Sequence, residues 1–399
     1  MSPRRMRALG AGIGLLLASP AAAQQVALLP PYQGVYQPKG VDEIGLWHEY
    51  DEDERALAAS SLVVRDQHLT DYLHTVLCDT VGKDRCASAR IYVIRAPVFN
   101  ATMAANGTMR VFTGLFLRVR NEAELATVLG HEFGHFERRH GLDKFKARRS
   151  SSDAVAWMAL LAGMAATYGS MSSYQNFQLS VYGGLYRYGR DQEREADRLG
   201  IAYLNQSHLR PQAASAIWQH VMEEAEASAS AKGLKKPNFK TIAFADSHPP
   251  EAERAGYLAA LAAPDGAGRD DGADRYRAAL APFLGQFLDD QIKLNDFGAS
   301  DYLIQNLATT GWTGTLWTKR GDLYRTRGNP RDLIAATEFY ANAVKLDPTL
   351  AEAHRGLGLS LIKTGRASEA VVPLQTYLGL RPDATDAGMI KMMIPGESK

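Results

Sequence analysis

The chain has 399 residues, of which 46% are hydrophobic, and it carries a formal net charge of +1. This length is sufficient for two or three domains. The balance of 45 basic against 44 acidic residues gives no indication of a nucleic-acid partner.

The N-terminus has the features of a secretory signal peptide over residues 1–23. Three arginines precede an apolar run from Ala8 to Ala18, and the alanines at 21–23 form a cleavage site before Gln24. The run is too short for a stable membrane span, and no cysteine follows the cleavage site directly. We therefore expect a mature protein that begins near Gln24 and is exported to a bacterial periplasm without a lipid anchor.

The chain contains only two cysteines, Cys78 and Cys86. An oxidising compartment allows them to pair, and the polar, glycine-containing segment between them suits a short loop. We predict a disulfide that clamps this loop locally. Two free thiols are the alternative.

The first part of the mature chain is expected to combine helices with a small sheet. Residues 50–80 carry an apolar stripe with helical spacing, residues 89–117 carry strand signals, and residues 121–145 form an amphipathic helix. An apolar run at 154–166 is shorter than a membrane span and is predicted to be a buried helix or a cover over a cleft. Peripheral contact with a membrane surface is the alternative for this run.

The helix expected at 121–145 contains the sequence His-Glu-Phe-Gly-His at positions 131–135. Residues i and i+4 share one helix face, so His131 and His135 can bind one metal ion, while Glu132, about 100° away, borders the site without being a ligand. Two imidazoles beside a carboxylate suit Zn²⁺ and a zinc-bound water. We predict one zinc per chain, with Glu132 as the general base for hydrolysis. The alternative is an exposed helix with two solvated histidines.

The residues just after this motif do not supply a third ligand. Arg138 and Gly141 occupy the positions where one class of zinc proteases has glycine and histidine. His140 follows His135 at i+5, which in a continuous helix lies on the wrong face to join the pair.

A downstream helical segment, 190–200, carries four acidic side chains at alternate positions, from Asp191 to Asp197. Glu193 and Asp197 share a face, whereas Glu195 lies about 200° round from Glu193. We therefore predict Glu193 as the third metal ligand and Asp197 as the acceptor for the free ring N–H of a ligand histidine. The alternative is a solvated, salt-bridged helix face.

These motifs together resemble the HtpX and CAAX-prenyl-protease type of zinc metallopeptidase. The resemblance rests on residues 131–135, Glu193-x-x-Ala196-Asp197, and Ser247-His248-Pro249-Pro250 with Arg254, and it covers roughly residues 45–260. It is greatest for the soluble periplasmic branch that carries helical repeats and acts in outer-membrane protein quality control. The resemblance implies a zincin-like domain and misfolded or stalled envelope proteins as substrates.

The resemblance also implies roles for two further segments. His248 matches a histidine that can bind the zinc as a fourth ligand and hold the enzyme latent. The two prolines that follow His248 favour an extended loop. The alternative is an ordinary exposed loop histidine. Residues 107–112 correspond to an edge strand on which an extended substrate would pair.

Peptide hydrolysis also needs a stabiliser for the oxyanion besides the metal. The candidates are His248, Arg254, and a tyrosine from Tyr182, Tyr186 or Tyr188. The sequence does not choose among them.

The C-terminal part has an internal repeat that follows a polar, glycine-rich linker at 263–275. Pro348 and Pro382 lie 34 residues apart, which is the period of tetratricopeptide repeats, and small residues at fixed positions would let paired helices approach closely. A plain helical bundle is the alternative. Such repeats stack into a concave surface for partners, and the outer-membrane β-barrel assembly machinery is the partner that the resemblance suggests.

The sequence thus predicts a mainly helical, α+β protein with a zincin-like metallopeptidase domain and a small β-sheet at 24–262, followed by an α-helical tetratricopeptide domain at 276–399. Its predicted activity is that of a periplasmic zinc endopeptidase with a downstream glutamate ligand. A chaperone-like repeat adaptor with a latent or inactive zinc domain is the alternative.

Overall fold

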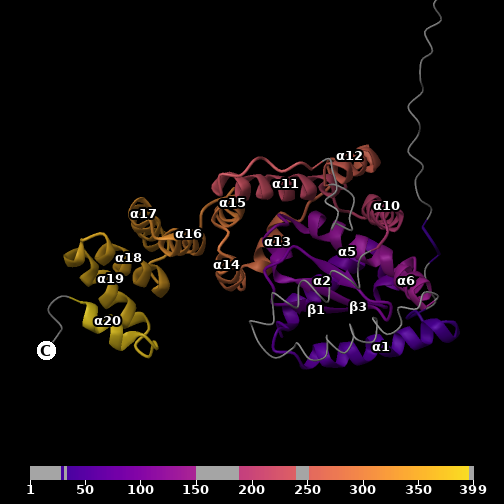
Figure 1. Cartoon of the computed structure of the whole chain (residues 1–399), viewed down its shortest axis with the longest axis horizontal. Helices are drawn as coiled ribbons and strands as arrows, with labels where there is room; N and C mark the ends of the chain where they lie inside the picture. The colour runs from indigo at the N-terminus through magenta and orange to yellow at the C-terminus, as the bar shows by residue number, and fades with distance from the viewer. Residues whose placement is uncertain (1–27, 31–33, 150–187, 240–250, 395–399) are drawn as a thin grey trace, which may run out of the picture.

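The computed structural model describes residues 28–30, 34–149, 188–239 and 251–394 (Figure 1). Four predictions lie outside the described residues: the signal peptide at 1–23, the apolar run at 154–166, the tyrosines Tyr182 and Tyr186, and His248.

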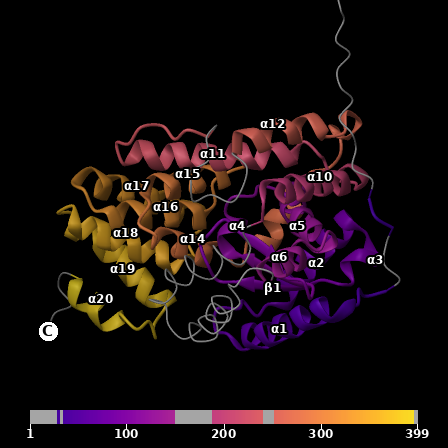
Figure 2. The same cartoon turned by 45° about the vertical axis from the view of Figure 1, so that its right-hand side comes forward.

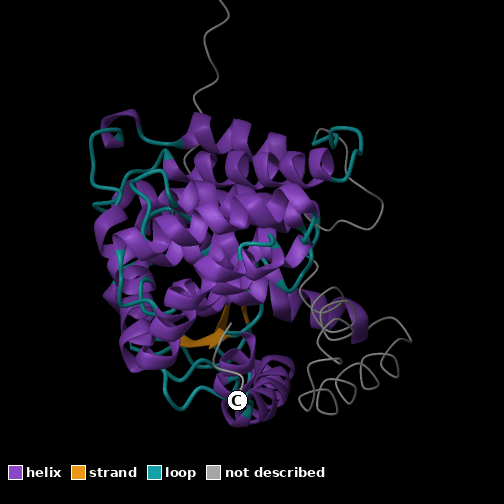
Figure 3. Cartoon of the chain, turned by 90° about the vertical axis from the view of Figure 1, so that its left-hand side faces the viewer, coloured by secondary structure: helices purple, strands orange, loops and turns teal. Residues whose placement is uncertain are grey.

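The N-terminal region, residues 34–262, is built from helices around a small sheet. Its helices are α1 (Gly40–Ala59), α2 (Gln67–Val81), α3 (Lys83–Cys86), α4 (Thr113–Phe116), α5 (Glu122–Glu137), α6 (His140–Arg149), α10 (Arg190–Gln206), α11 (Ala213–Ala231) and α12 (Glu251–Leu261). Its strands are β1 (Arg90–Ile94), β2 (Ala101–Met103) and β3 (Thr108–Phe112). The predicted class, mainly helical with a small sheet, is confirmed, as Figure 3 shows.

The strands are arranged in the order β1-β3-β2. β1 runs parallel to β3, and β2 runs antiparallel to it with Met103 opposite Met109. The prediction that residues 107–112 form an edge strand is therefore wrong, because β3 is hydrogen-bonded on both sides. Among the described strands, β1 and β2 form the two edges of the sheet, and β2 is the edge strand that contacts α5.

α5 is the central helix of this region and is buried on nearly all of its faces. Asn121 caps its N-terminus, because the Asn121 side chain accepts a hydrogen bond of 2.8 Å from the Glu124 N–H. It packs against α2, α10, α11 and β2, so the motif at 131–135 lies in the interior of the fold (Figure 1). Cys78 at the end of α2 is disulfide-bonded to Cys86 in α3.

The C-terminal region, residues 263–394, is entirely helical in the part that the structure describes. Its elements are the 3₁₀ helix η2 (Pro264–Gly266) and the α-helices α13 (Ala273–Leu280), α14 (Leu284–Ile292), α15 (Phe297–Leu307), α16 (Gly314–Arg327), α17 (Pro330–Leu346), α18 (Ala351–Lys363), α19 (Ala367–Leu380) and α20 (Ala387–Met393). Helices α16 to α20 follow one another on the side of the molecule away from α10 (Figure 2). No helix within the described ranges combines the length and the apolar character that a membrane crossing requires.

Neighbouring helices of the C-terminal region pack through glycines, in keeping with a helical repeat. The ring of Tyr340 in α17 lies where β-carbons on Gly321 and Gly356 would be, at 2.7 and 2.2 Å from the ring. A larger side chain at either glycine would displace this buried ring. The small residues therefore allow α17 to pack closely against α16 and α18.

The segment predicted as a linker, 263–275, is held against the N-terminal region. Arg275 forms an ion pair of 2.5 Å with Glu122 at the start of α5, and the hydroxyl of the next residue, Tyr276, donates a 2.6 Å hydrogen bond to the Phe116 carbonyl. One hydrophobic core extends from Leu69 in α2 to Leu323 in α16. The two regions therefore share buried contacts across this segment.

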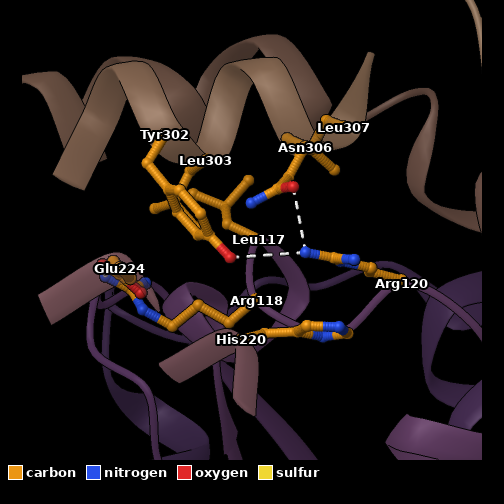
Figure 4. Close-up of a pocket in the computed structure, with 9 residues that line it drawn as sticks. All are labelled: Leu117, Arg118, Arg120, His220, Glu224, Tyr302, Leu303, Asn306 and Leu307. Atoms are coloured by element: carbon orange, nitrogen blue, oxygen red, sulfur yellow. Dashed lines mark hydrogen bonds and ion pairs between the residues drawn. The ribbon is translucent and has the colours of Figure 1, made fainter. Parts of the chain in front are cut away.

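A polar junction joins the loop after α4 to α11 and α15 (Figure 4). The Arg120 guanidinium donates hydrogen bonds to the Asn306 side-chain oxygen at 2.9 Å and to the Tyr302 hydroxyl at 3.3 Å. Arg118 pairs with Glu224 at 2.6 Å. The cavity between them is about 10 Å³, which is room for about one water molecule.

Candidate active site

The two histidines of α5 meet a glutamate from α10 in the interior of the N-terminal region. Nε2 of His131 lies 3.2 Å from Nε2 of His135. The Glu193 carboxylate, which is fully buried, places Oε2 3.6 Å from Nε2 of His131 and Oε1 3.6 Å from Nε2 of His135. The structure thus brings together all three predicted metal ligands.

This donor set fits a zinc ion. Zinc bonds of about 2.0–2.1 Å in a tetrahedron place ligand atoms about 3.3–3.4 Å apart. The two ring nitrogens are 3.2 Å apart, and a Glu193 oxygen lies 3.6 Å from each of them, Oε2 from His131 and Oε1 from His135. Two imidazoles and one carboxylate also leave a fourth position for water, as catalytic zinc sites do. The other metal-like cluster among the described residues, His74 with Cys78 and Cys86, has both thiols in the disulfide.

Small residues bring α10 close enough for Glu193 to reach the histidines. A β-carbon on Gly134 would lie 3.2 Å from the Ala196 carbonyl oxygen, and one on Gly200 would lie 3.1 Å from the His131 nitrogen. The two backbones are therefore nearly in contact, which explains why the sequence has glycine or alanine at these three positions.

Asp197 lies behind His131. Its Oδ1 is 2.8 Å from Nδ1 of the ring, the nitrogen that faces away from Glu193. Burial alone would raise the pKa of Asp197, but the charges of Arg254 and His131 outweigh burial and lower this pKa below its usual value. Asp197 is therefore a buried carboxylate that can hold the tautomer of His131.

Arg254, predicted as a contact for the oxyanion or the substrate, points instead at Asp197. Its Nε and Nη2 donate to the two carboxylate oxygens at 2.8 and 2.5 Å. The guanidinium is buried and lies over the Trp218 ring, 3.7 Å from the centroid. Nε and Nη2 are thus engaged behind His131, where Arg254 holds Asp197.

Glu132 borders the three ligands without joining them. Its Oε1 lies 4.0 Å from Nε2 of His131. Burial, and then the charge of Glu193, raise the pKa of Glu132 well above its usual value, while a backbone hydrogen bond from Met103 of β2 lowers it in part. A carboxyl with a raised pKa beside a metal site is suited to accept and return a proton.

His140, which we did not expect to join the two histidines on the metal, lies directly against the second ligand on the side away from Glu193. Its Nδ1 is 2.9 Å from Nδ1 of His135, and its Nε2 is 3.2 Å from Glu195. Burial lowers the pKa of His140, which favours a neutral ring. The expectation that His140 does not join the pair as a metal ligand agrees with the ligand group, which contains His131, His135 and Glu193. The contact with His135 was not foreseen, because α5 ends at Glu137 and a turn precedes α6, so the i+5 geometry of a continuous helix does not apply.

Tyr188 is the one oxyanion candidate among the three tyrosines that lies within the described residues. Its ring stacks on His135, with the centroids 4.0 Å apart and the planes at 18°. It therefore covers one face of the second ligand.

The sequence of the N-terminal region matches known peptidases. Residues 67–262 match peptidase family M48. The chain is 32% identical to the mitochondrial metalloendopeptidase OMA1 of Schizosaccharomyces pombe over 41% of its own length and 44% of that protein.

Two bacterial relatives show similar partial matches. Identity is 32% with a putative β-barrel assembly-enhancing protease of Vibrio cholerae, over 38% of this chain and 32% of that protein. It is 26% with the β-barrel assembly-enhancing protease of Escherichia coli, over 44% of this chain and 37% of the relative. The matched segment thus spans less than half the length of each of these relatives.

Proposed function

Because residues 67–262 match peptidase family M48, we propose that this chain is a zinc-dependent endopeptidase of the bacterial envelope. One observation carries the proposal: two histidines and a glutamate are buried close enough together to bind a single ion, with a second carboxylate beside them. A purely structural zinc site would have no use for that second carboxylate.

The chemistry divides between the ion and the chain. Zinc bound by His131, His135 and Glu193 would supply a Lewis acid for the peptide carbonyl and for the attacking water. Glu132 takes the proton from that water and passes it to the leaving amine. The open edge of β2, next to Glu132, can pair with an extended substrate through backbone hydrogen bonds.

We propose misfolded or stalled outer-membrane proteins as the substrates and the periplasm as the compartment. The bacterial relatives support this, since they are named for enhancing β-barrel assembly. The helices of the C-terminal region would dock the substrate or the assembly machinery, and His248 would act as a latency switch by approaching the metal.

Zinc binding and proteolysis test the proposal together. The full chain and its Glu193→Gln variant are purified under metal-replete conditions, and zinc per chain is measured beside cleavage of a denatured outer-membrane β-barrel protein. About one zinc in the parent and clearly less in the variant supports the site. No zinc in the parent, or zinc indifferent to Glu193, contradicts it.

The His248→Ala variant separates the enzyme from a repeat adaptor with an inactive zinc domain. A latent enzyme should cleave faster when the switch is removed. Zinc-loaded protein that cleaves nothing with or without His248 would favour the adaptor.

A further inference from the structure

Each of the two ligand histidines has a partner behind it, and the two partners differ. His131 faces Asp197, which Arg254 holds. His135 faces another histidine, His140, at 2.9 Å between the two Nδ1 atoms. The description of the site above gives Asp197 and Arg254 a role behind His131 and leaves His140 without one.

The direction of the hydrogen bonds behind His135 follows from metal binding. A histidine that binds metal through Nε2 carries its proton on Nδ1 and donates it. The Nδ1 of His140 must therefore accept, which leaves the proton of its neutral ring on Nε2. That N–H points at Glu195 Oε2, 3.2 Å away. Arg138 forms an ion pair with the other oxygen of Glu195, with Nε 3.0 Å from Oε1.

The conformation of the turn between α5 and α6 positions His140 against His135. Arg139 has a φ of 59°, the left-handed conformation that residues with a side chain rarely adopt. Its guanidinium stacks over the Tyr36 ring at 3.2 Å and over the Phe136 ring at 4.3 Å, and it pairs with Glu43 at 3.4 Å. These contacts offset the energetic cost of the left-handed backbone at Arg139. The turn then places His140 against His135.

We propose that His140 is a positioning residue for the metal site. Glu195, paired with Arg138, fixes the ring of His140, and His140 in turn fixes the ring of His135 by accepting its Nδ1 proton. The α10 helix would then serve the metal at three alternate positions: Glu193 as a ligand, and Asp197 and Glu195 as the anchors of the two histidines. The proposal rests on the zinc site proposed above. It concerns the tautomer and orientation of His135, and His140 touches neither metal nor substrate.

The test compares two replacements of His140 in the full chain. His140→Leu keeps the apolar volume but has no acceptor, whereas the side-chain oxygen of His140→Asn can replace Nδ1 as the acceptor. Zinc affinity is measured by competition with a chromophoric chelator on metal-free protein. We expect His140→Leu to bind zinc about 10- to 100-fold more weakly, which is the typical effect of removing a hydrogen-bond partner of a metal-binding histidine. We expect the zinc affinity of His140→Asn to remain within about threefold of the parent, because the acceptor is kept. The visible spectrum of the Co²⁺-loaded protein should shift for His140→Leu and stay close to that of the parent for His140→Asn.

His354→Leu is the matched control, because His354 is also buried and hydrogen-bonded but lies in α18, far from the site in sequence. It should leave zinc affinity unchanged. Equal zinc affinity in His140→Leu and the parent would overturn the relay, and so would equal losses in the leucine and asparagine variants, which would indicate packing alone.

A Glu195→Ala variant keeps the proposal falsifiable if His140→Leu does not fold, because the Glu195 side chain is 42% exposed and tolerates replacement. We expect zinc affinity to fall severalfold, and an unchanged affinity would overturn the relay. A parent protein without zinc would instead contradict the proposed function itself, so the two failures are distinguishable.

Discussion

Gly134 of α5 packs against Ala196 of α10 so closely that a β-carbon on Gly134 would lie 3.2 Å from the Ala196 carbonyl oxygen. This contact sets the distance between the helix that carries the histidines and the helix that carries Glu193. The metal site therefore depends on a packing contact that involves none of its ligands.

Gly134→Val should separate α5 from α10. The added atoms meet backbone and the Leu199 β-carbon at 3.2–3.3 Å, so the helices must move apart. We expect a loss of about 1–3 kcal/mol in the free energy of unfolding, as is typical of overpacking, together with weaker zinc binding. Urea unfolding of the metal-free protein and a zinc titration measure the two effects.

Gly130→Ala on the same helix is the control. A β-carbon there meets its nearest neighbour at an ordinary 3.5 Å. Removing a glycine from a helix interior should stabilise the protein by up to about 1 kcal/mol with zinc binding unchanged. If Gly134→Val bound zinc as tightly as Gly130→Ala, the close approach of the helices would not matter for the site.

Glu132→Gln should abolish proteolysis and spare the metal. The carboxylate lies beside His131 and outside the three-ligand set, so its loss removes a proton acceptor and no ligand. We expect turnover to fall by about 10²- to 10⁴-fold, the usual contribution of a general base, at parental zinc content. Cleavage at the parental rate would remove Glu132 from the mechanism.

Asp197→Asn should weaken both the fold and the metal site. Arg254 would keep its buried charge without a counterion, which typically costs about 3–5 kcal/mol, and His131 would lose its charged acceptor, for an expected 10- to 100-fold loss of zinc affinity. Asp191→Asn is the control on the same helix, since the Asp191 side chain is fully exposed. Similar behaviour of the two variants would contradict the role of Asp197.

The disulfide should contribute stability and no chemistry. Cys78 and Cys86 are separated by 8 positions in sequence, and closing so short a loop is worth about 2–3 kcal/mol in the chain-entropy estimate. We expect Cys78→Ser with Cys86→Ser to melt at a lower temperature and to retain parental zinc content. Unchanged melting of the parent in reducing buffer would contradict a stabilising role.

Regular helix geometry made much of the site predictable from sequence. The i, i+4 spacing placed His131 and His135 together, and the alternate acids on α10 identified Glu193 and Asp197, because both segments are continuous helices. Predictions failed where the backbone leaves regular geometry. The left-handed turn at Arg139 redirects His140, and nothing in the local sequence shows that Tyr36 and Glu43 support that turn.

Long-range pairing was likewise beyond local reasoning. β3 lies between β1 and β2 because two separate chain segments pair with it, and the resemblance alone indicated an edge strand. Arg254 has the charge expected of an oxyanion contact, but a partner 57 positions away, Asp197, determines where it points.

The ion pair between Arg327 and Asp332 gives a prediction about pH. Hydrogen bonding to Arg327 lowers the pKa of Asp332 in the folded protein below its ordinary value of about 3.9. The pair therefore stabilises the fold above the unfolded-state pKa, and this contribution is lost as the pH falls through the folded-state pKa. The melting temperatures of the parent and Asp332→Asn should differ most near pH 6 and converge between about pH 4 and pH 2.

Glu338→Gln removes an exposed charge from the same helix, α17, and should show no such convergence. A difference between the parent and Asp332→Asn that is constant with pH would show that the carboxylate acts through neutral hydrogen bonds at the start of α17 and that its charge is not what stabilises the fold.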